Sequence, residues 1–82
     1  MMKHITIYDL LPLLKKGWVA MDRDGVWWWI KYKPRCRTTF GEWVSEYMAN
    51  TFYHESLYPF NIAPFDGDWK DSLIKVEHKE EE

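Results

Sequence analysis

Aromatic and basic side chains occupy every second position of residues 27–37, and they are the groups best suited to chemistry in this sequence. In an extended strand, every second side chain points to the same face. One face would therefore carry two indole rings and four cations, namely Trp27, Trp29, Lys31, Lys33, Arg35 and Arg37. Rings stack or fill pockets and cations pair with carboxylates or phosphates, so the row predicts binding to a partner.

Three interpretations of this row are open. A protein interface is favoured, because Trp and Arg are enriched at binding hot spots and separate areas of opposite charge steer a partner. A single-stranded nucleic-acid (RNA) platform would stack bases on the rings, although the acidic second half of the chain would repel a long strand. In the third interpretation, Trp27 or Trp29 packs beneath a helix and the cations form a solvated edge. The exposed strand edge would also allow two copies to pair as a homodimer.

Three aspartates near the C-terminus form a secondary acidic surface, at Asp66, Asp68 and Asp71. Such a set most often keeps a chain soluble. It would also fit a basic groove that normally holds nucleic acid.

No metal, cofactor or catalytic site is expected. The candidate metal ligands are isolated from one another, without the short spacing of zinc sites, at His4, Cys36, His54 and His78. There is no nucleophile elbow or phosphate-binding glycine loop, since each glycine is explained by a turn or a cap. The chain is therefore predicted not to be an enzyme.

The elements that position these residues begin with a short helix and a β-hairpin. Leucines at helical spacing over residues 10–14 predict the helix, for which Asp9 is the preferred N-cap and Thr6 the alternative, with Pro12 in the first turn. Residues 18–21 and 26 onward flank an Asp-Gly turn, the signature of a hairpin closed by Gly25. On the second strand, Trp28 and Ile30 are expected to face the core.

An amphipathic helix is expected to pack on this hairpin. Thr39 and Glu42 have capping-box spacing, and apolar residues recur with helical period from about Phe40 to about His54. The prolines of residues 58–65 then require an extended path. A turn at Asp66–Asp68, a single helical turn begun by Asp68, and a third strand at Ile74–Val76 would follow, with Trp69 anchoring this segment to the core.

Charge is divided unevenly along the chain. Residues 1–37 carry eight basic and three acidic side chains, and residues 38–82 carry three and ten, which gives the net charge of −2. The composition predicts one small α+β domain over residues 1–77 and a frayed acidic tail over residues 78–82. Without a leader or a long apolar run, and with a single cysteine, the expected location is the cytoplasm, with no membrane association.

Two stretches resemble segments of short uncharacterised proteins of phages and prophages. They are residues 9–22, which include GWVAMD, and residues 61–74, which include PFDGDWKDSLI. Together they make up about a third of the chain, and residues 33–58 are outside the resemblance. The resemblance implies no reaction and no catalytic residues.

What the resemblance implies is a setting in a bacterial host cell. Small acidic phage proteins often act by occupying a host protein, and inhibitors of defence systems, including anti-CRISPR proteins, are a prominent group. The expected function is stoichiometric inhibition or modulation of a defence nuclease, with a CRISPR effector or another nucleic-acid-binding defence protein as partner. Direct nucleic-acid binding by the same row of residues is the alternative.

Overall fold

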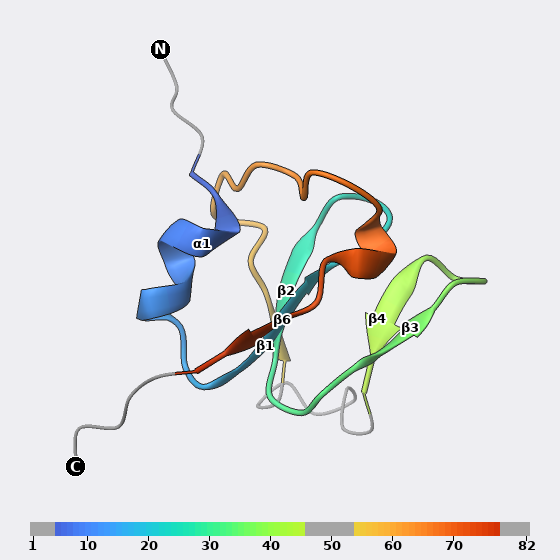
Figure 1. Ribbon diagram of the computed structural model, residues 1–82, viewed down its shortest axis with the longest axis horizontal. Coiled ribbons are helices and arrows are strands. Elements are labelled where there is room, and N and C mark those ends of the chain that lie inside the picture. Colours follow the sequence, from blue (N-terminus) through green and yellow to red (C-terminus); the bar gives the residue numbers. More distant parts are fainter. Residues whose placement is uncertain (1–4, 46–53, 78–82) are drawn as a thin grey trace.

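Two antiparallel sheets and three short helical turns make up the computed structural model, which describes residues 5–45 and 54–77. The elements in chain order are α1 (Ile7–Leu10), η1 (Leu11–Leu13), β1 (Gly17–Met21), β2 (Trp27–Ile30), β3 (Arg35–Arg37), β4 (Glu42–Val44), β5 (His54–Ser56), η3 (Trp69–Asp71) and β6 (Ile74–Val76). One sheet has four strands in the order β5-β2-β1-β6, and β3 and β4 form a separate hairpin (Figure 1). The predicted α+β class is confirmed.

The central hairpin is the element that the sequence predicts best. β1 and β2 pair with Trp18 opposite Ile30 and Met21 opposite Trp27. Gly25 has a φ of 93°, and its N–H donates to the carbonyl oxygen of Asp22 at 2.9 Å. Glycine adopts this positive φ without steric cost, which explains why the chain reverses here.

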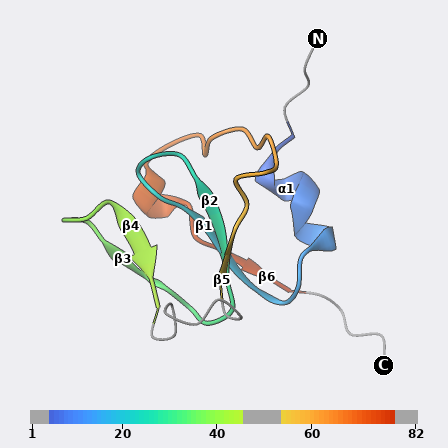
Figure 2. The ribbon, with the colours of Figure 1, turned by 180° about the vertical axis from the view of Figure 1, so that it is seen from behind.

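Both faces of the four-stranded sheet are covered, which places the β2 tryptophans in the core. On one face, Trp27 and Trp29 are 2% and 7% exposed and pack with Ile7 of α1 and with Leu57. On the other, Ile30 packs with Trp43 of β4, with Trp28 half-buried beside them. Figure 2 shows α1 on one side of the sheet and the β3–β4 hairpin on the other. The prediction that Trp27 and Trp29 lie on an exposed face is therefore wrong.

The long second strand expected through Arg37 is interrupted. β2 ends at Ile30, Pro34 is buried, and Arg35–Arg37 pairs with β4 instead of continuing the ribbon. Proline has no N–H to donate to a neighbouring strand, so the strand stops before Pro34 and a new one begins after it. The six residues of the predicted row therefore do not share one face.

The helix expected from Phe40 is wrong at both described ends. Glu42–Val44 is strand β4, His54 begins strand β5, and residues 46–53 lie outside the described part of the chain. Gly41 has a φ of 70° and its N–H donates to the carbonyl oxygen of Arg37 at 2.9 Å, so residues 38–41 form a hairpin turn. A helix requires a negative φ at every residue, so the positive φ of Gly41 prevents a helix from continuing through this position.

Thr6, and not the preferred Asp9, begins the first helix. The Thr6 N–H donates to the Asp9 carboxylate at 2.9 Å, which is the reciprocal half of a capping box. Pro12 then lies in η1, where the helix tightens into a 3-10 turn. The alternative interpretation of this segment is therefore the correct one.

The C-terminal segment forms as predicted. The Asp68 carboxylate accepts the Lys70 N–H at 2.9 Å and caps η3, and β6 pairs with β1 at the edge of the sheet. Trp69 packs against both hydrophobic clusters, with its ring centroid 6.4 Å from that of Trp43. It is the predicted anchor.

Ser72 fastens this segment to β1. Its side chain is fully buried, accepts the Met21 N–H at 2.8 Å, and lies 2.7 Å from the Trp69 carbonyl oxygen, to which it donates. A buried donor left without an acceptor costs the desolvation of that group.

Replacing Ser72 by alanine should lower the free energy of unfolding by about 1–3 kcal/mol, because the Met21 N–H would lose its acceptor in the core. Urea denaturation followed by tryptophan fluorescence measures the change. Ser56→Ala is the matched control, because Ser56 accepts the exposed Tyr58 N–H at 3.1 Å, and the loss of that bond should cost less. Equal effects of the two substitutions would contradict the role given to Ser72.

Candidate functional site

The two tryptophans of the predicted partner-binding row are fixed inside the molecule. The Trp27 indole N–H donates to the Ala63 carbonyl oxygen at 3.2 Å, and that of Trp29 donates to the Lys15 carbonyl oxygen at 2.9 Å. Buried indoles with satisfied N–H groups are typical of a core. Neither ring is available on the surface as an anchor for a partner.

The four cations of the row divide into two pairs. Lys31 and Lys33 lie in the β2–β3 connection, and the Lys33 ammonium is 5.5 Å from the centroid of the Trp18 ring. Arg37 lies on β3, where its guanidinium stacks 4.2 Å from the Phe40 ring and is 3.6 Å from the Glu42 carboxylate. Arg35 is exposed at the start of the same strand.

One end of the sheet, which we name the lysine end, carries five exposed lysines, and the ammonium groups of Lys33 and Lys75 lie beside the Trp18 ring. The Lys75 ammonium of β6 lies 5.7 Å from the Trp18 centroid, and Lys75 is directly opposite Trp18 in the strand register. The full set is Lys15, Lys16, Lys31, Lys33 and Lys75, with Trp18 and Tyr32. Sequence reasoning missed Trp18 as a surface residue, although the Asp-Gly hairpin register, which places it opposite Ile30 and next to Lys31, could have indicated it.

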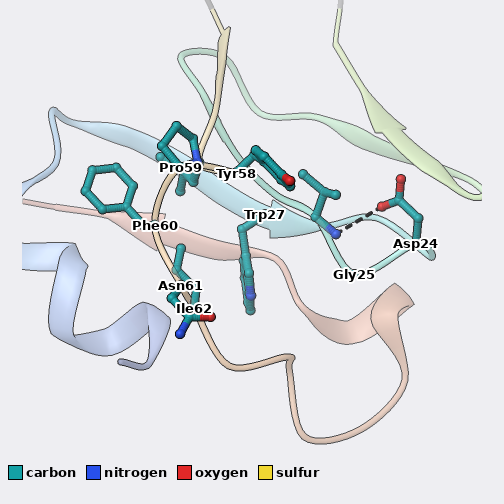
Figure 3. Close-up of a pocket in the computed structure, with 10 residues that line it drawn as sticks. Asp24, Gly25, Trp27, Tyr58, Pro59, Phe60, Asn61 and Ile62 are labelled. Carbon is teal, nitrogen blue, oxygen red and sulfur yellow. Dashed lines mark hydrogen bonds between the residues drawn. The ribbon is translucent and has the colours of Figure 1, made fainter. Parts of the chain in front are cut away.

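The opposite end of the sheet carries two grooves that share Trp27 as a lining residue. The first has a volume of about 540 Å³ between the hairpin turn and residues 57–62, and the second, of about 350 Å³, lies between α1 and residues 63–66. Figure 3 shows Tyr58, Pro59 and Phe60 on one side of the first groove and Asp24 on the other.

We name the rim of these grooves the aromatic surface. Tyr58 is 78% exposed and Phe60 48%, although both belong to residue types that folding usually covers. Its members are Tyr8, Tyr58, Pro59, Phe60, Pro64 and Phe65. The sequence signal was the Tyr-Pro-Phe segment, which we interpreted only as an extended path.

Carboxylates accompany the aromatic surface. Asp24 lines the first groove and Asp66 the second, and neither groove is lined by a lysine or an arginine among the described residues. Of the predicted acidic surface, Asp66, Asp68 and Asp71 are all exposed. Asp68 is engaged locally, because its hydrogen bonds to the Lys70 backbone and side chain lower the pKa of its carboxyl.

The half-buried carboxyl of Asp22 joins the two hairpins. Its Oδ1 accepts the Trp43 backbone N–H at 2.9 Å, while the Trp43 indole donates to the Met21 carbonyl oxygen at 3.1 Å. Burial raises the pKa of Asp22 to about 6, with smaller contributions from the nearby charges of Asp24 and Glu42, although the hydrogen bond from Trp43 opposes the rise.

Two of the described side chains that could act as nucleophiles are Cys36 and Ser72. Burial raises the pKa of the Cys36 thiol, which keeps it in its less reactive protonated form. The Ser72 hydroxyl is occupied by backbone groups. Among residues 5–45 and 54–77, no three His, Cys, Asp or Glu side chains gather in a way that could hold a metal ion, and no helix is long and apolar enough to cross a membrane.

Comparison with protein families, curated proteins and solved structures finds no match to this chain.

The Asp22 carboxyl predicts a pH dependence of stability. Because the pKa of Asp22 is higher in the folded state, the protonated carboxyl stabilises the fold. This stabilisation is fully present below the unfolded-state pKa of about 4 and is lost as the pH rises through about 6. Asp22→Asn keeps an oxygen that accepts the Trp43 N–H but does not ionise. The variant should match the wild type near pH 4 and exceed its free energy of unfolding by roughly 1–2 kcal/mol above pH 7.

Chemical denaturation of both proteins across this pH range measures the difference. A difference in free energy of unfolding between the two proteins that is the same at every pH would show that Asp22 does not titrate as its burial implies.

Proposed function

We propose that this chain is a small binding protein of phage type that inhibits or modulates a bacterial defence nuclease stoichiometrically, without catalysis, in the cytoplasm of the host. The observation that carries the proposal is the aromatic surface around Trp27. Its exposed rings, two adjoining grooves and flanking carboxylates are the features of a preformed protein interface.

The aromatic surface suits a protein partner because its shape is fixed before binding. Trp27 is held by the Ala63 carbonyl oxygen and packs edge-to-face against Phe65, with ring centroids 6.4 Å apart. Above this rigid base, Tyr58 and Phe60 offer large apolar areas with few rotatable bonds. Little conformational entropy is then lost on association, which favours tight binding.

The charge of the aromatic surface indicates a basic partner. Asp24 and Asp66 lie on the walls of the two grooves, and the exposed Asp68 and Asp71 follow in the chain. A nuclease presents such a basic area where it normally holds nucleic acid, and a CRISPR effector is one example. The resemblance of residues 9–22 and 61–74 to phage proteins supports this class of target.

The surface proposed to bind the partner differs from the row of residues predicted from the sequence. Trp27 and Trp29 support the interface from within, and the contacting rings come from α1 and residues 58–65. Lys31, Lys33, Arg35 and Arg37 lie outside the lining of both grooves. These cations would therefore face away from a basic partner seated on the aromatic surface.

The double variant Tyr58→Ala, Phe60→Ala should abolish inhibition while leaving the fold intact, because both side chains are exposed. Wild-type protein expressed in bacteria that carry individual defence nucleases should raise phage plating in one strain. The double variant should bind the nuclease of that strain at least about tenfold more weakly, as expected for loss of hot-spot contacts worth more than 1.4 kcal/mol. Purified nuclease from that strain should bind the wild type one to one.

Leu13→Ala is the matched control, because Leu13 is 78% exposed but lies outside both grooves. It should retain inhibition and binding. Wild-type protein that protects phage in no strain would contradict the assignment to defence nucleases. A double variant as active as the wild type would contradict the aromatic surface as the interface.

A further inference from the structure

We infer that the lysine end is a second binding site, whose ligand is single-stranded nucleic acid. It is separate from the aromatic surface. In the β1–β2 register, Trp18 lies at one end of the pair and Met21, opposite Trp27, at the other, about 10 Å away along the strand. Binding at the lysine end and binding at the aromatic surface can therefore be tested independently.

Three strands build the platform of this site. Trp18 on β1 lies between Ile30 on β2 and Lys75 on β6 in the strand register. Neighbouring strands are spaced about 4.8 Å apart, so the three strands span about 10 Å. Lys31 directly follows Ile30 at the same end of the sheet, and its ammonium lies 5.7 Å from the centroid of the Tyr32 ring.

The positive charge at this end is concentrated. All five lysines are exposed, and they reach the site from the α1–β1 connection, the β2–β3 connection and β6. The Lys75 ammonium lies 3.3 Å from the Glu77 carboxylate, which is itself 66% exposed. An exposed pair of this kind contributes little, so Lys75 can exchange Glu77 for a phosphate at small cost.

The aromatic rings favour nucleic acid over an acidic peptide. Tyr32 is 39% exposed and Trp18 is half-buried, with the Lys33 and Lys75 ammonium groups holding its ring in place. Bases stack on such rings while lysines neutralise the adjoining phosphates. A run of carboxylates would engage the lysines alone and leave the rings unused.

Fluorescence anisotropy with a labelled oligothymidine strand of about a dozen nucleotides tests the inference. Binding should be measurable at low salt, and the logarithm of affinity should fall with the logarithm of salt with a slope of about −2 to −3, as expected for three or four phosphate contacts. A strand of the same length without bases should bind at least about fivefold more weakly, because it cannot stack.

The double variant Lys33→Ala, Lys75→Ala should reduce the steepness of the salt slope by about 1–2 and weaken binding at low salt by about tenfold or more. Lys70→Ala is the matched control, since Lys70 is exposed, pairs with Asp68 and belongs to η3. It should bind as the wild type does. Circular dichroism of each variant checks that the fold is retained.

Three results would overturn the inference. One is the absence of oligothymidine binding at low salt, and another is equal loss of binding in Lys70→Ala and in the double variant. The third is a polyglutamate peptide, or the strand without bases, binding as tightly as oligothymidine, which would make the lysine end a general anion site. The Tyr58→Ala, Phe60→Ala variant should bind oligothymidine normally, whichever result is found for the nuclease.

Discussion

The structure depends on the three consecutive tryptophans of β2, because side chains that alternate along a strand bring large rings to both faces of the sheet. Trp27 and Trp29 face α1 and the 57–65 segment, and Trp28 faces the side covered by β4 and η3. Each face must be covered to keep these rings from water, and an indole is among the largest apolar groups that folding can bury. The second hairpin, the capped turn at Asp68 and the proline-rich segment all serve this requirement. The grooves and the lysine end lie where that cover stops, at the two ends of β1 and β2.

Local signals were sufficient for the parts of the fold that local chemistry decides. The Asp-Gly turn at Gly25 and the cap at Asp68 each act within a few residues, so the hairpin, η3 and β6 follow from the sequence. The helix predicted from Phe40 failed because its apolar period competes with contacts made far along the chain, above all those of Asp22 with Trp43. That both faces of β2 are covered could not be predicted either, since the cover comes from segments such as α1 and β4, which lie more than ten residues before and after it in the chain.

The candidate sites could likewise be predicted only where local sequence determines them. The predicted row of residues 27–37 joined Lys31 and Lys33 to rings that belong to the core. In the structure, the Lys33 ammonium lies beside the Trp18 ring and the Lys31 ammonium beside the Tyr32 ring. The resulting molecule has an acidic, aromatic end and a basic end. Its small net charge of −2 is therefore the sum of two surfaces of opposite charge.

Hydrogen exchange of the indole N–H groups, followed by NMR, tests most directly whether the tryptophans of β2 are the core of the molecule. The indoles of Trp27, Trp29 and Trp43 donate to the carbonyl oxygens of Ala63, Lys15 and Met21, respectively. Buried and bonded donors exchange only when the structure opens, so these three signals should persist long after exposed amides have exchanged. Rapid exchange of the Trp27 and Trp29 indole N–H groups in the folded protein would show that both rings are exposed to solvent and would contradict this account.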